Sequence, residues 1–128
     1  MTRTLVKMSL IPLAVMSTAC ERQVSFKADV QPVLVEKCVS CHSPGGRGYA
    51  ASGFSVASYQ SVMKGTKYAE VIVPGSSLDS TLVRLIRHEA DPSIAMPKSH
   101  DQGKPSEWLT REQIALIATW IDQGAKNN

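Results

Sequence analysis

The sequence predicts a small all-α domain of four to five helices, and three observations lead to that prediction. Apolar residues recur at every third or fourth position in two long stretches, 26–38 and 109–121, as they do on one face of a helix. The chain between these two stretches is interrupted repeatedly by glycine and proline, which end helices and form turns. The chain has 128 residues, a length that suits one domain.

The first expected helix covers residues 27–37. Pro32 lies within it, and proline is tolerated only near the start of a helix because it lacks an N–H and its ring clashes with the preceding turn. The helix should therefore begin near Ala28 or Asp29. Its apolar face consists of Phe26, Val30, Val33, Leu34 and Cys38.

The motif Cys38-Val39-Ser40-Cys41-His42 follows at the end of this helix. Residues three and four apart lie on one face of a helical turn, so Cys38 and Cys41 can both reach one porphyrin edge and form two thioethers. His42 follows at once, and its imidazole can ligate the iron. The C-x-x-C-H pattern therefore predicts one covalently attached haem c, with Cys38 and Cys41 as its anchors and His42 as an axial ligand.

A zinc half-site and a disulfide are the alternative interpretations of this motif. A tetrahedral zinc site commonly uses two cysteine pairs, but the chain has only three cysteines. A disulfide between Cys38 and Cys41 would leave His42 without a role. Both alternatives lack partners in this chain.

The middle of the chain is expected to hold one loop and two short helices. Residues 43–56 are rich in turn-forming residues and are predicted to be a structural loop. A helix is expected over residues 58–64, and a turn at 73–75 precedes a further helix that Asp79 or Ser80 can cap. That helix should run to about residue 88, with Leu82, Leu85 and Ile86 on its apolar face.

The long segment 89–109 is expected to supply the second axial ligand, because a structureless stretch of this length in a small domain is usually functional. Met96 is the first candidate, since Pro97 stiffens the loop that presents its sulfur and His/Met ligation occurs in cytochromes c. His100 is the second candidate. Met63 is expected to fill the core, and His88 is expected to be solvated.

Three arginines are candidates to pair with the haem propionates, although each is more simply a solvated surface charge. These are Arg47, Arg84 and Arg87.

The last helix is the best specified. Thr110 and Gln113 form a capping box at its start, and Leu109 and Ile114 are placed as a hydrophobic staple. Gly124 ends the helix. Its apolar stripe, expected to pack on the amino-terminal helix, consists of Ile114, Ile117, Trp120 and Ile121.

The amino terminus predicts export. Residues 1–19 carry two basic residues, a short apolar run and a small-residue cleavage site, as in a secretory signal peptide. Cys20 then resembles the lipid-bearing cysteine of bacterial lipoproteins, although Ser17 stands where leucine is usual; ordinary cleavage at the same site would leave a free thiol. Residues 20–25 are expected to be a short tether and residues 26–128 the domain. Lipid-anchored attachment to the cell envelope is favoured over a soluble periplasmic protein, and Glu21 favours the outer membrane.

The composition excludes a nucleic-acid-binding protein, which normally shows a strongly basic domain. The chain has 14 basic and 11 acidic residues, and removal of residues 1–19 with Arg3 and Lys7 leaves 12 − 11, a formal charge of +1. Large aromatic residues are few: two Trp, three Tyr and two Phe. A buried porphyrin would supply the apolar core that such a small domain otherwise lacks.

With these residues in view, the chain resembles small monohaem cytochromes c, and in particular the planctomycete type of cytochrome c domain. The resemblance covers nearly all of the mature chain. It is carried by Phe26 with Asp29-Val30-Gln31-Pro32-Val33-Leu34, by Cys38–His42, by Val73-Pro74-Gly75 with Ser80–Leu85, by Met96-Pro97, and by Leu109-Thr110 with Trp120–Ala125. The resemblance implies the cytochrome c fold, haem on Cys38 and Cys41, His42 as the proximal ligand and Met96 as the distal one.

The function predicted from the motif and the resemblance is electron transfer between redox partner proteins. No set of side chains typical of a hydrolase or other enzyme stands out, so no catalytic residue is assigned. The first alternative is a peroxidase or gas sensor with an open sixth position on the iron. The second is a non-catalytic haem subunit of a larger redox complex.

Overall fold

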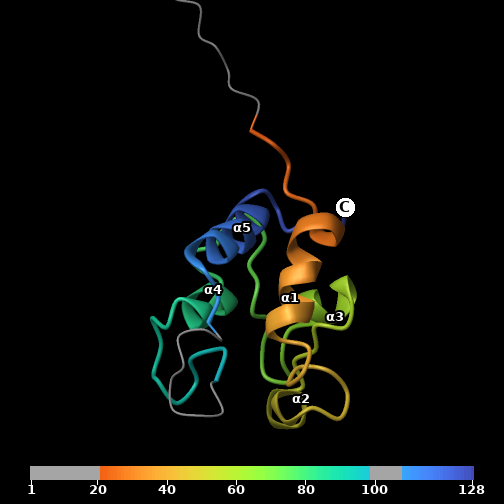
Figure 1. The fold of residues 1–128 in the computed structure, drawn as a ribbon, viewed down its shortest axis with the longest axis vertical. Helices are drawn as coiled ribbons and strands as arrows, with labels where there is room; N and C mark the ends of the chain where they lie inside the picture. Colours follow the sequence, from red (N-terminus) through yellow and green to blue (C-terminus); the bar gives the residue numbers. More distant parts are fainter. Residues whose placement is uncertain (1–20, 99–107) are drawn as a thin grey trace, which may run out of the picture.

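The computed structural model describes residues 21–98 and 108–128, and within them the chain is helical and forms no β-strand. A π-helical turn, η1, precedes five α-helices (Figure 1). Their bounds are η1 Phe26–Val30, α1 Gln31–Lys37, α2 Arg47–Ser52, α3 Tyr59–Lys64, α4 Thr81–Ile86 and α5 Arg111–Asp122. The predicted all-α class is confirmed. None of these helices is both long enough and apolar enough to cross a membrane.

The first helix begins at Phe26, two to three residues earlier than predicted. Ser25 caps it by accepting a hydrogen bond from the Ala28 N–H at 3.1 Å, while the Ser25 N–H donates to the Asp29 carboxylate at 2.8 Å. Pro32 then stands at the second position of α1, directly after η1. Proline would disrupt the interior of a regular α-helix. Here the wider π turn comes before it, so Pro32 stands in the first turn of α1, where proline is tolerated.

The prediction of a loop over residues 43–56 is wrong, because the six residues of α2 form a helix inside it. Gly46 has an extended backbone at the start of α2, and Gly53 takes a left-handed conformation with φ of +74° at its end. The Ser52 hydroxyl donates to the Gly48 carbonyl at 2.7 Å. The glycines that predicted a loop therefore act as the two ends of a short helix.

Helix α3 lies where it was predicted, whereas α4 ends at Ile86, about two residues early. In α4 the buried residues are Leu82, Val83 and Ile86, and Leu85 is only half-buried. Ser80 precedes α4 but its side chain makes no cap. The fully buried hydroxyl instead accepts from the Val73 N–H at 2.9 Å and donates to the Ser76 carbonyl at 2.8 Å, so it holds the turn before the helix.

Helix α5 follows its prediction closely. Thr110 and Gln113 form the capping box, with each side chain accepting from the backbone N–H of the other residue, at 3.2 and 2.9 Å. Leu109 is buried just before the helix, and Ile114 packs against the core. Gly124 follows the helix with φ of +99°.

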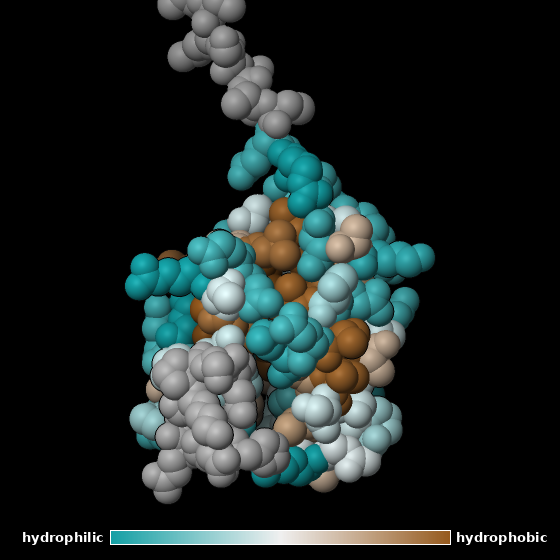
Figure 2. Space-filling view, viewed as in Figure 1, coloured by the Kyte–Doolittle hydropathy of each residue, from teal (hydrophilic) through white to brown (hydrophobic). Residues whose placement is uncertain are grey.

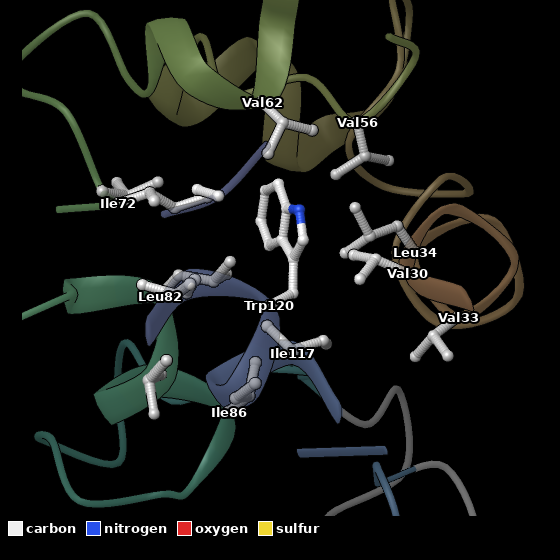
Figure 3. Packing of buried hydrophobic residues seen from close by; sticks show 14 of the residues in the cluster. Val30, Val33, Leu34, Val56, Val62, Ile72, Leu82, Ile86, Ile117 and Trp120 are labelled. Carbon is white, nitrogen blue, oxygen red and sulfur yellow. The ribbon is translucent and has the colours of Figure 1, made fainter. Parts of the chain in front are cut away.

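The core is built around Trp120 of α5, which has no exposed surface. Figure 3 shows its indole ring enclosed by aliphatic side chains, including Leu34 of α1, Val62 of α3 and Ile72 of the segment between α3 and α4. The ring centroids of Phe26 and Trp120 lie 5.4 Å apart, which confirms that α5 packs on the amino-terminal helix. The face seen in Figure 2 is mainly hydrophilic, with apolar residues gathered in small areas.

Residues 24 and 25, in the segment expected to be a tether, contact the helical part of the chain. Val24 is buried, and its N–H donates to the Gln123 side chain at 2.7 Å. Asn128 binds the same region, because its side chain accepts from the Phe26 N–H at 2.8 Å and its carbonyl accepts from the Lys27 N–H at 3.0 Å. Figure 1 shows the carboxyl terminus beside the start of the first helix.

Candidate haem site

The C-x-x-C-H motif forms one tight turn directly after α1. The Cys38 N–H donates to the Leu34 carbonyl at 2.9 Å and so closes the helix. The Cys38 carbonyl then accepts from the Cys41 N–H at 3.2 Å and from the His42 N–H at 2.8 Å. These bonds gather the two thiols and the imidazole within a single turn of backbone.

The His42 ring is held by a carbonyl that the sequence does not identify. Its Nδ1 atom lies 3.2 Å from the Phe54 carbonyl oxygen, and the Val56 N–H donates to the His42 carbonyl at 2.8 Å. Burial lowers the pKa of His42, which favours the neutral ring. A proton on Nδ1, donated to Phe54, leaves the Nε2 lone pair available for a metal.

Gly48 provides the space in which this ring lies. A Cβ atom at position 48 would stand 2.8 Å from Cε1 and 2.9 Å from Nε2 of His42, closer than nonbonded carbon and nitrogen atoms approach. The next residue of α2, Tyr49, donates its N–H to the Cys41 carbonyl at 2.9 Å. Helix α2 is therefore fastened to the motif, and its glycine faces the imidazole. Sequence reasoning missed both the helix and the role of Gly48.

Burial also affects Cys38. It raises the pKa of the Cys38 thiol to about 11, and the neighbouring Cys41 adds to the increase. The thiol is therefore protonated at neutral pH. Both cysteines of the motif are free thiols in the structure.

A cavity of about 790 Å³ brings the predicted site residues together. Cys38, Cys41 and His42 line it along with Met96, which is distant in sequence. Figure 1 shows the motif and α2 on one side of the lower half of the domain, and the segment after α4 on the other. The Met96 N–H donates to the Leu85 carbonyl at 3.1 Å, so the end of α4 holds the methionine beside the cavity.

Residues 38–100 match the family model described as planctomycete cytochrome c. This segment belongs to that family. The chain is also 27% identical, over 130 aligned positions, to hydrazine synthase subunit alpha of Kuenenia stuttgartiensis. That alignment covers 83% of this chain but only 16% of the relative, so the chain spans about a sixth of its length. No solved structure matches the chain significantly.

The structure distinguishes among the residues that the sequence offered as a second axial ligand. Met96 lines the cavity, whereas His88 does not and instead stacks on Trp108 with ring centroids 4.1 Å apart. The expectation that His88 is solvated is therefore wrong. Met63 packs against the core, as predicted. His100 lies outside the described residues, as does Cys20.

Arg47 is the only one of the three candidate arginines that lines the cytochrome cavity. It is the first residue of α2, next to the motif turn. Lys37 and Lys98 also line the cavity, and Lys37 forms an ion pair with Glu36 at 3.0 Å. A guanidinium at this position suits a propionate carboxylate.

The residues present fit a haem. Two thiols, a neutral imidazole cradled by a glycine and a thioether line one cavity, whose apolar wall includes Ile86 and Leu109. Among the residues that the structure describes, no group of three or more His, Cys, Asp or Glu could hold a metal ion. The zinc interpretation of the cytochrome motif therefore gains no further ligands from this part of the chain.

Proposed function

We propose that this cytochrome c domain carries single electrons between protein partners, using one haem c held by Cys38 and Cys41 and ligated by His42 and Met96. One observation carries the proposal. The motif residues and Met96, which lie more than 50 positions apart, line the same cavity. A bound haem supplies a one-electron couple between ferrous and ferric iron.

The chain's own residues explain how such a site would stay rigid during electron transfer. Cys38 and Cys41 sit in a turn closed by backbone hydrogen bonds, and the Phe54 carbonyl fixes the orientation of the His42 ring. Leu85 holds the backbone of Met96. Because each ligand is fixed by a neighbour, little rearrangement should accompany a change of oxidation state. Methionine ligation also favours a higher reduction potential than ligation by two histidines.

The cavity lining reaches the surface at Ser40, Arg47 and Lys98, which are all exposed. A redox partner would therefore dock over this opening. Small, transient interfaces are typical of proteins that exchange electrons.

The spectrum of the ferric protein tests the proposed ligation. The native protein should show the red charge-transfer band of methionine-ligated haem, and Met96→Ala should lose it. Met63→Ala is the matched control, because Met63 packs in the core, and it should retain the band. Rapid binding of carbon monoxide to the native ferrous protein would instead favour a peroxidase or gas sensor with an open sixth position.

The relative named as an enzyme subunit supports testing a second role, that of a haem-bearing part of a larger redox complex. Stopped-flow mixing with a reduced dehydrogenase or an oxidase distinguishes the two. Electron exchange with a soluble partner supports the carrier. Stable co-purification in a complex, without such exchange, supports the subunit.

We also propose that the protein is exported and anchored to the cell envelope by lipid on Cys20. The signal-like residues 1–19 and the position of Cys20 support this, together with the haem motif, since c-type haem is attached outside the bacterial cytoplasm. Intact mass spectrometry of the mature protein would report the cleavage site, the haem and the acyl chains together. A mass without acyl chains would contradict the lipid anchor and leave the haem assignment intact.

A further inference from the structure

His88 and Trp108 form a contact that the ligand assignments leave unexplained. His88 follows α4 and takes a left-handed backbone conformation with φ of +57°, which is uncommon for a residue other than glycine. Its ring lies on the Trp108 indole, with centroids 4.1 Å apart and planes 33° apart. Its Nε2 atom is buried and has no hydrogen-bond partner among the described residues. Stacking, rather than hydrogen bonding at Nε2, therefore fixes this ring.

The stack lies beside the segment that presents Met96. His88 and Trp108 line a second cavity of about 390 Å³ together with Ala95 and Pro97, the two residues that flank Met96. The Leu85 carbonyl accepts from the His88 N–H at 3.2 Å and from the Met96 N–H at 3.1 Å. His88 and Met96 thus share one anchor at the end of α4.

The stack also connects this segment to α5. Trp108 is followed by Leu109, which is buried and lines the 790 Å³ cavity beside Met96. Thr110 then begins α5. Three parts of the domain meet at the stack: the end of α4, the Met96 segment and the start of α5.

We propose that the His88–Trp108 stack positions Met96 as the distal ligand, with His88 and Trp108 acting as positioning residues that do not touch the iron. The proposal rests on the His42/Met96 ligation proposed above. Without the stack, the Met96 segment would spend more time away from the iron. An aromatic contact of this kind shifts such an equilibrium by roughly threefold to tenfold.

Two variants remove the stack from opposite sides, namely His88→Ala and Trp108→Leu. Each should weaken the red charge-transfer band of the ferric protein and lower its midpoint potential. Each should also increase the rate at which carbon monoxide binds the ferrous protein, by roughly threefold to tenfold. His88→Phe keeps an aromatic ring on Trp108 and should retain the native band, potential and rate. Tyr68→Leu is the control for loss of an exposed aromatic residue, because Tyr68 is 78% exposed and lines neither cavity.

The outcomes separate this proposal from the ligation on which it rests. If Met96→Ala keeps the red band, the ligation itself is wrong. If Met96→Ala loses the band while Trp108→Leu and His88→Ala match the native protein, the ligation holds and the positioning role is refuted. If His88→Ala does not accumulate with haem, Trp108→Leu decides, because Trp108 is already 39% exposed. A shift in His88→Phe equal to that in His88→Ala would also refute the stack, since the aromatic ring is retained.

Discussion

Ser77 donates two hydrogen bonds to the carboxylate of Asp122, one from its backbone N–H at 2.6 Å and one from its hydroxyl at 2.9 Å. Asp122 is the last residue of α5, and Ser77 lies in the turn before α4. The adjacent residue Ile121 accepts from the Gly75 N–H at 2.8 Å. These bonds join the turn before α4 to the carboxyl-terminal end of α5, although the two lie far apart in the sequence.

Replacement of Asp122 by alanine should destabilise the domain. Hydrogen bonds to a charged group contribute about 1.5–3 kcal/mol each when buried, and these exposed bonds should contribute less, about 1–2 kcal/mol together. Urea unfolding followed by circular dichroism measures the change. Glu70→Ala, at an exposed acidic residue outside the helices, is the control and should stay within about 0.5 kcal/mol of the native protein. Equal stability of the two variants would contradict the role of this pair.

Gly48→Ala should impair haem attachment although alanine favours helix formation. The added methyl group would stand less than 3 Å from two atoms of the His42 ring, so the imidazole must move. Helix propensity alone predicts the opposite sign, a gain of about 0.5–1 kcal/mol in α2. The haem content per mole of purified protein is the measurement.

The control for this prediction is Ala50→Gly, which changes propensity in the same helix at an exposed position. It should lower stability slightly and leave the haem content unchanged. Full haem content in Gly48→Ala would show that the ring has room to move.

Ser80→Ala should be among the most destabilising single-atom deletions in the domain. The hydroxyl is fully buried and serves both the Val73 N–H and the Ser76 carbonyl. Leaving buried polar groups without partners costs about 1–3 kcal/mol. In a domain of this size, each kcal/mol of lost stability lowers Tm by roughly 4–8 °C. Thr81→Ala, at the adjacent exposed position, should change Tm far less.

The Arg22–Asp29 pair should make stability depend on pH in the acid range. Hydrogen bonds from the Arg22 side chain, and then from the Ser25 N–H, lower the pKa of Asp29 below its ordinary value of 3.8. The folded protein therefore holds the charged form more strongly than the unfolded chain does. Its contribution is fully present above pH 3.8 and is lost as the pH falls through the lowered value.

The difference in unfolding free energy between the native protein and Asp29→Asn measures this contribution. The difference should be constant near neutral pH and should shrink below about pH 4. Arg22→Gln removes the first cause of the pKa change and should reduce the pH dependence. A difference that grows on acidification would have the wrong sign for this explanation.

The sequence predicted best those features that depend on neighbouring residues. The capping box at Thr110 and the apolar stripe that ends at Ile121 are local patterns, and both appear in the structure as expected. The motif at residues 38–42 is local for the same reason, and the structure forms it as one tight turn whose thiols and imidazole line a cavity. Met96 was singled out from its place in a long segment before Pro97, and the structure places it in the lining of the same cavity; its role as a ligand stays a prediction.

The missed features depend on contacts between distant residues. Helix α2 is only six residues long and has glycines on both sides, so its sequence read alone resembles a loop. A contact with the distant Cys41 carbonyl holds it to the motif turn. The Phe54 carbonyl that binds His42 belongs to the backbone, which carries no residue-specific signal. The position of His88 follows from its contact with Trp108, 20 residues later in the chain. Nothing in the sequence distinguished Gly48 from the neighbouring glycines, because its role depends on its contact with the His42 ring.

The chain enters the domain at the end that lies opposite the cavity. Residues 21–25 join the upper end of the first helix, whereas the motif turn and α2 lie at its lower end (Figure 1). The seven residues of α1 alone extend over about 10 Å at 1.5 Å per residue. An attachment before residue 21 would therefore hold the domain at the end opposite His42. The cavity beside His42 would then face away from the attachment point and stay accessible to a redox partner.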